Sequence, residues 1–153
     1  MTKGKYREIK GDLLEMAKIG ECFDIIAHGC NCHQMMGAGI ALGVKKVFPM
    51  AHLIDHKDKR EPIQRLGDLT YVHNIGSDVF VVNLYTQFYG GANLDYSALE
   101  LSLRKLTMEF PAPRRIGLPM IGCGIAGGDW NKVKRIIKRV LSEYDVTIVI
   151  YDK

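Results

Sequence analysis

The chain has 153 residues, of which 47% are hydrophobic and 25% are charged, and its formal net charge is +4. This balance is typical of one globular domain, residues 1–153, with a sizeable hydrophobic core, and it excludes a disordered chain. The sequence contains no run of about 18 apolar residues, and no long apolar segment follows its basic amino terminus. We therefore expect a soluble, cytoplasmic protein without a signal peptide or a membrane span.

Strand-like and helix-like segments alternate in the first part of the chain. The predicted order up to residue 66 is a half-exposed edge strand (5–10), a helix capped by Asp12 (13–19), an apolar strand (23–27), a polar glycine-containing loop from His28 onward, a basic-sided helix (40–47), a helix from Pro49 to about Lys57, and a charged surface loop (57–66).

The second part continues this alternation. The predicted order is two strands (68–75 and 79–86) joined by a hairpin connection, a loop (87–93), a helix capped by Asp95 with an apolar stripe of Leu99, Leu103, Leu106 and Phe110, a short strand (115–120), a glycine-rich loop (121–128), a helix capped by Asp129, and a buried strand (145–151). Interleaved strands and helices predict a three-layer α/β/α domain with a mixed, mostly parallel central sheet.

Two glycine-containing loops follow strand ends, where open α/β sheets bind their ligands. Gly37 and Gly39 precede one helix, and residues 121–128 precede another. Free backbone N–H groups and the positive end of a helix dipole both favour an anion, and glycines let a ligand oxygen approach the main chain. The sequence matches neither the P-loop nor the dinucleotide-binding motif. Two separate loops of this kind are suited to the two phosphates of one pyrophosphate.

The four cysteines and the basic residues indicate less about function than the glycine loops do. Cys22, Cys30, Cys32 and Cys123 are expected to be reduced thiols rather than nucleophiles, and the Cys-x-Cys spacing is too tight for a structural zinc site, so we expect no metal and no cofactor. His33, His52, His56 and His73 are expected on the surface. The basic residues at 57–60 and 132–139 have no interleaved aromatic residues, so we interpret them as solvated faces rather than a nucleic-acid groove.

These motifs together resemble those of the macro domain family, which binds ADP-ribose. The resemblance rests on Gly11-Asp12-Leu13, on His28-Gly29-Cys30-Asn31 with Gly37-Ala38-Gly39-Ile40-Ala41, and on the segment from Pro119 to Gly128. It spans essentially the whole chain. The segment around His28 is most similar to the Appr-1''-p processing branch, which includes the ADP-ribose 1''-phosphate phosphatases.

The resemblance implies a role for each matched residue. Asp12 would accept a hydrogen bond from the adenine amino group, with Leu13 beside it, and Asn31 would bind the distal ribose. The diphosphate would be wrapped by the backbone of Gly37, Ala38, Gly39 and Ile40 and of Gly122, Cys123, Gly124, Ile125 and Ala126. Phe88 and Tyr89 are candidates to shield the ribose.

The resemblance also implies hydrolysis of ADP-ribose 1''-phosphate to ADP-ribose and phosphate. His28 is the candidate general acid or base, because the pKa of histidine lies near neutrality, and Asn31 is the second candidate catalytic residue. One alternative is removal of ADP-ribose from modified protein or nucleic acid, the only case in which nucleic acid is expected as a partner. That branch uses Lys and Asp where this chain has Gln87 and Ala126. A non-catalytic ADP-ribose reader is the other alternative.

Overall fold

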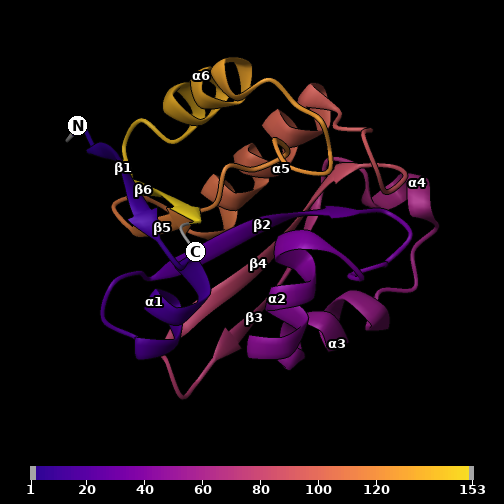
Figure 1. Ribbon diagram of the computed structural model, residues 1–153, viewed down its shortest axis with the longest axis horizontal. Coiled ribbons are helices and arrows are strands. Elements are labelled where there is room, and N and C mark those ends of the chain that lie inside the picture. Colours follow the sequence, from indigo (N-terminus) through magenta and orange to yellow (C-terminus); the bar gives the residue numbers. More distant parts are fainter. Residues whose placement is uncertain (1–2, 152–153) are drawn as a thin grey trace.

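A six-stranded sheet lies between two layers of helices in the computed structural model, which describes residues 3–151 (Figure 1). The strands are β1 (Tyr6–Gly11), β2 (Ile25–Asn31), β3 (Leu69–Asn74), β4 (Val79–Gln87), β5 (Arg115–Leu118) and β6 (Asp145–Tyr151). The helices are α1 (Leu13–Ile19), α2 (Gly39–Val47), α3 (Pro49–Lys57), α4 (Pro62–Arg65), α5 (Tyr96–Glu109) and α6 (Trp130–Val140). The predicted three-layer architecture is confirmed.

The strand order is β1-β6-β5-β2-β4-β3, and only β3 runs antiparallel to its neighbour. The other neighbouring strands pair in parallel. The β3–β4 hairpin and the position of β1 at an edge both confirm the predictions. Because the parallel strands end on the same side of the sheet, the loops that follow β2, β4 and β5 lie at one carboxyl edge.

Alternate residues of the central strands face the two helical layers, which gives the sheet two hydrophobic cores. Ile25 and Ala27 pack with the apolar stripes of α5 and α6, whereas Ile26 packs with α1, α2 and α3. Figure 1 shows α5 and α6 on one face of the sheet and α1, α2 and α3 on the other. Three aspartates cap α1, α5 and α6 as predicted, since their side chains accept backbone N–H bonds in the first turn.

Two predicted boundaries were wrong. β2 does not end at Ala27 but continues to Asn31, because its parallel pairing with β4 runs on from His28 opposite Asn83 to Asn31 opposite Gln87. The segment from 57 to 66, predicted as a surface loop, contains α4 and a buried arginine, Arg65. Within residues 3–151, no helix is long and apolar enough to cross a membrane.

Candidate functional site

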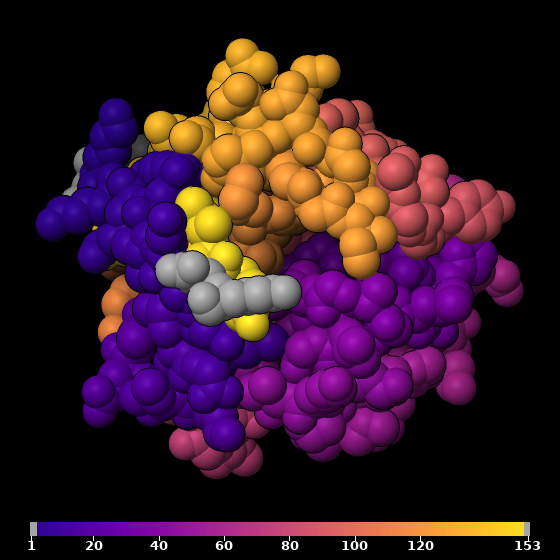
Figure 2. Space-filling view, viewed as in Figure 1, coloured from indigo at the N-terminus to yellow at the C-terminus, as the bar shows by residue number. Residues whose placement is uncertain are grey.

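A cavity of about 1130 Å³ opens at the carboxyl edge of the sheet. Figure 2 shows the surface hollowed between the orange part of the chain, which includes the loop after β5, and the purple part, which includes α2. The ends of β2, β4 and β6, the start of α1 and the start of α2 also line the cavity. All of the predicted ligand-binding residues, from Asp12 to Ala126, are among the lining residues.

The two glycine loops converge across this cavity. Gly39 begins α2 with a φ of +59°, and Gly122 turns the loop after β5 with a φ of +72°. A Cβ atom at Gly39 would lie 3.4 Å from Cδ1 of Ile125, so the two loops approach each other closely. Ala38 caps α2 without a side-chain hydrogen bond, and the first N–H groups of a helix have no partner within it. The site therefore offers backbone donors from two directions.

Asp12 lies at one end of the cavity, where β1 passes into α1. One of its carboxylate oxygens, Oδ1, accepts hydrogen bonds from Leu14 N at 3.1 Å and Glu15 N at 3.2 Å. These two bonds use only one oxygen of an acceptor-only group, which leaves the second oxygen for a ligand donor. The side chain of Leu13 is buried in the core beside it. This end of the cavity combines a carboxylate with an apolar wall.

Asn31 lies at the end of β2 and organises the loop that follows. Its Nδ2 donates to Met35 O at 3.0 Å, and its Oδ1 accepts from His33 N at 3.0 Å. Beside this loop, the ring of His33 stacks on Tyr89 with a centroid distance of 5.1 Å, which links it to the loop after β4. His33 is exposed, as predicted. The loops after β2 and β4 therefore meet near Asn31.

His28 does not line the cavity. Strand alternation turns its side chain toward α3, and only 1% of the residue is exposed. Its Nε2 lies 2.6 Å from Oδ1 of Asn83, whose Nδ2 donates to Ala51 O and to Thr70. This network makes Asn83 Oδ1 an acceptor, so Nε2 of His28 carries the proton. Burial lowers the pKa of His28 to about 4. The geometry therefore argues against His28 as the general acid or base.

The neutral state of His28 should make the protein acid-sensitive. Its pKa falls from 6.5 to about 4 on folding, so the stability that it contributes is complete above about pH 6.5 and lost as the pH falls toward 4. The loss is on the order of 3 kcal/mol. A His28→Gln variant keeps a donor to Asn83 and does not titrate. We expect its free energy of unfolding, measured with urea, to fall less between about pH 7.5 and about pH 4 than that of the wild type. Equal losses in both proteins would contradict this.

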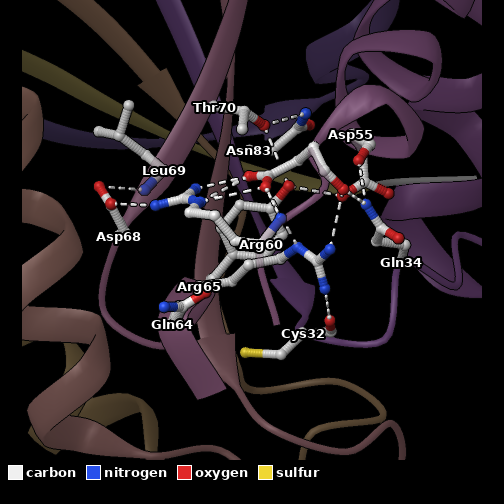
Figure 3. A network of polar contacts seen from close by, with 12 residues as sticks. Cys32, Gln34, Asp55, Arg60, Gln64, Arg65, Asp68, Leu69, Thr70 and Asn83 are labelled. Carbon is white, nitrogen blue, oxygen red and sulfur yellow. Dashed lines mark hydrogen bonds and ion pairs between the residues drawn. The ribbon is translucent and has the colours of Figure 1, made fainter. Parts of the chain in front are cut away.

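A polar network behind the cavity holds the loop that follows Asn31 (Figure 3). Nη1 of Arg65 donates to Cys32 O at 2.7 Å. The amide of Gln34, whose φ is +61°, donates to the backbone carbonyls of Asp55 and of Asp58. A non-glycine residue in the left-handed region is strained, and these bonds hold it there. We name residues 32–36 the β2 loop.

The sequence did not identify several residues of the cavity wall. Thr86, Lys46 and Tyr151 line it, and the buried hydroxyl of Thr86 has no hydrogen-bond partner among the described residues. The parallel order of the strands was the available signal, since β4 and β6 end at the same edge as β2. Burial raises the pKa of Cys30 and of Cys123, so both thiols are protonated at neutral pH, which argues against a thiolate nucleophile.

The fold and the cavity define a three-layer α/β/α domain with a large cleft at the carboxyl edge of its sheet. The chain is 33% identical over 156 residues to an uncharacterized 17.5 kDa protein of Enterobacteria phage T4, which covers 94% of this chain and 95% of the phage protein. It is 27% identical over 181 residues to an ADP-ribose 1''-phosphate phosphatase of Meyerozyma guilliermondii, with 99% of each chain covered. It is 26% identical over 145 residues to the human ADP-ribose glycohydrolase OARD1, covering 94% of this chain and 88% of OARD1.

Solved structures of macrodomains are also similar to this chain. A macrodomain protein from Streptomyces coelicolor superposes with a TM-score of 0.72 at 26% identity, covering 97% of this chain and 99% of that one. The macrodomain of Mycobacterium tuberculosis DarG superposes with a TM-score of 0.77 at 22% identity, covering 98% of this chain and 99% of that one. No family model matches the sequence. The chain belongs to the macro domain family.

Proposed function

We propose that this protein binds ADP-ribose and hydrolyses ADP-ribose 1''-phosphate to ADP-ribose and phosphate. The observation that carries the proposal is the convergence of two glycine loops in one cavity that is also lined by a carboxylate, Asp12, and by an amide, Asn31. The relatives named ADP-ribose 1''-phosphate phosphatase and ADP-ribose glycohydrolase support a hydrolase acting on an ADP-ribose derivative.

Each part of the ligand has a matching part of the cavity. The second oxygen of Asp12 accepts from the adenine amino group, and Leu13 packs beside the base. Backbone N–H groups of residues 37–40, at the start of α2, and those of the loop 122–126 other than Cys123, whose N–H donates to Met120 O, hold the diphosphate. The N–H of Asn31 Nδ2 that does not donate to Met35 O binds the distal ribose. The cavity is lined by both α1 and β6, which supports one functional unit over residues 1–153.

The proposed reaction depends on positioning and on electrostatic stabilisation. A water oxygen forms a bond to phosphorus, the bond between phosphorus and the 1'' oxygen breaks, and the 1'' oxygen receives the proton that the attacking water gives up. Within residues 3–151 no histidine lines the cavity, so His28 acts through packing and hydrogen bonding rather than on the substrate. Backbone donors stabilise the charge that develops on the phosphoryl oxygens. Turnover is expected to be slow, because phosphate esters are among the slowest bonds to hydrolyse.

The test combines calorimetry with ADP-ribose and phosphate release from ADP-ribose 1''-phosphate. We expect binding in the first assay and release above background in the second. Asn31→Ala should lower kcat more than it weakens binding of ADP-ribose. Binding without phosphate release would refute the phosphatase and leave a reader. ADP-ribose released from a modified acceptor on a gel would assign the glycohydrolase activity instead.

The role of Gln87 bears on which of the two reactions the protein catalyses. Nε2 of Gln87 donates to Tyr89 O at 2.7 Å and to Gly91 O at 2.9 Å, so this side chain supports the loop after β4. That structural role favours the phosphatase over the branch that uses a lysine there.

The cysteines within residues 3–151 are free thiols, as in a reducing compartment, which supports a cytoplasmic location.

Asp12 should contribute separately to folding and to binding. Asp12→Ala removes the helix cap and the proposed adenine contact, so we expect a loss of about 1 kcal/mol in stability and a roughly 10- to 100-fold loss of affinity for ADP-ribose. Asp12→Asn keeps a cap but replaces an acceptor oxygen with a donor. It should lose similar affinity at nearly wild-type stability, measured by urea unfolding and calorimetry. Unchanged affinity in the asparagine variant would remove Asp12 from the adenine site.

A further inference from the structure

Two histidines and an aspartate gather on α3, away from the cavity. His52, Asp55 and His56 have the spacing i, i+3 and i+4, which places them on one face of the helix. Their candidate ligand atoms, one from each residue, all lie within 4.8 Å of one another, and none of the three residues lines the cavity. Asp55 is fully buried, His52 is half-buried and His56 is exposed. The cluster therefore reaches from the interior to the surface. The predicted surface position is confirmed for His56 but not for His52, which is half-buried.

Two atoms of this cluster have no hydrogen-bond partner within residues 3–151. Oδ1 of Asp55 accepts from the hydroxyl of Tyr85 at 2.5 Å, but Oδ2 is buried and unpartnered, and so is Nδ1 of His52. Burying a polar atom without a partner is costly, and a buried carboxylate oxygen is normally bonded to a donor or to a cation. Among the described residues Asp55 forms no ion pair, and Arg65 pairs with Asp58 instead. The cluster lacks a positive partner at its buried end.

We propose that His52, Asp55 and His56 bind one divalent transition-metal ion, with Zn²⁺ as the best match. Two imidazole nitrogens and a carboxylate oxygen are ligands that zinc accepts, and three protein ligands leave a fourth position for water at the exposed side. Ligand atoms around tetrahedral zinc lie about 3.4 Å apart, so closing the site takes small side-chain rotations. The rings of His52 and His56 already lie edge to face, with centroids 4.1 Å apart.

The surroundings of the cluster are suited to a metal ligand set. The hydroxyl of Tyr85 is also 3.1 Å from Oγ1 of Thr70, so Asp55 is oriented from behind, as carboxylates at metal sites are. The backbone of Asp55 accepts from Gln34 in the β2 loop, and Figure 3 shows these two residues pointing toward each other. A bound ion would therefore stiffen the support of that loop.

The direct test is calorimetric titration of ZnCl₂ into the full chain, free of any polyhistidine tag and previously stripped with a chelator. We expect one ion per chain and a higher melting temperature with zinc present. The His52→Ala/His56→Ala double variant should weaken binding at least about 100-fold, because both nitrogen ligands are lost. The matched control is His33→Ala/His73→Ala, which removes two exposed histidines outside the cluster and should keep wild-type affinity. Equal zinc binding in both double variants would overturn the proposal.

Loading the chain with cobalt(II) distinguishes metal binding at this cluster from metal binding at the cysteines. The absorption spectrum of the cobalt-loaded chain should contain ligand-field bands without a thiolate charge-transfer band, because the proposed ligands are nitrogen and oxygen. A thiolate band that disappears in Cys30→Ser or Cys32→Ser would place the ion at those residues instead. Absence of heat, of a melting shift and of a cobalt spectrum in the wild-type chain would also refute the site. Circular dichroism of each variant verifies that it is folded.

Discussion

Gly124→Val is expected to weaken ADP-ribose binding at least about 100-fold while changing the free energy of unfolding by less than about 0.5 kcal/mol. Gly124 lines the cavity, and a Cβ atom at this position meets nothing within 4 Å, so the new side chain enters open space without disturbing the core. That space is where the proposed diphosphate approaches the backbone. Calorimetry with ADP-ribose and urea unfolding measure the two quantities.

Two further glycines provide the comparison. Gly37 also lines the cavity with open space at its Cβ position, so Gly37→Val should reproduce the loss of affinity. Gly76 has the same open space but lies between β3 and β4, outside the cavity, so Gly76→Val should bind like the wild type. If Gly124→Val and Gly76→Val bound ADP-ribose equally well, the diphosphate would not lie against the glycine loops.

Arg65→Ala is expected to cost about 3–5 kcal/mol of stability, the largest effect that we predict for a polar residue. The side chain is 5% exposed, and its guanidinium donates to Cys32 O and to Asp58 O. Removing it leaves the buried carbonyl of Cys32, the part-buried carbonyl of Asp58 and the nearly buried carboxylate of Asp58 with fewer donors. Urea unfolding gives the change, provided that the m-value of the variant stays that of the wild type.

The contrast with Arg60 tests the explanation. Arg60 pairs with Asp58 and Asp68, but its side chain is 35% exposed, so solvent screens these pairs and Arg60→Ala should cost about 1 kcal/mol or less. Arg65→Lys should recover only part of the loss, because an ammonium lacks the planar fork that reaches both carbonyls. Similar costs for the alanine variants of Arg65 and Arg60 would contradict the assignment of the main effect to burial.

Local chemistry explains which parts of the fold were predictable. Each of the three capping aspartates precedes an apolar periodic segment, so helix starts could be derived from neighbouring residues alone. The end of β2 could not be derived from neighbouring residues. His28 and Asn31 are polar, as loop residues often are, but their pairing with a strand distant in the sequence keeps them extended. The burial of Arg65 likewise depends on carbonyls far away in the sequence, such as that of Cys32.

Some features of the candidate site could also be predicted from the sequence, whereas others depend on the three-dimensional fold. Glycine loops that follow strand ends are visible in the sequence, and the rule for parallel sheets places them at one edge, so Gly39 and Gly124 could be brought to one cavity. The direction of the His28 side chain depends on strand alternation, which could be counted only after β2 was known to pass through it. The cluster on α3 could not be derived from the sequence, because no local pattern indicates that Asp55 is buried.

The close approach of the two glycine loops has a consequence for how a ligand leaves. Ile125 is largely exposed and lines the cavity, and its tip lies beside the start of α2. A diphosphate that is bound by both loops leaves only after its bonds to both loops are broken. Substitutions that loosen either loop should therefore shorten the residence time of the proposed ligand.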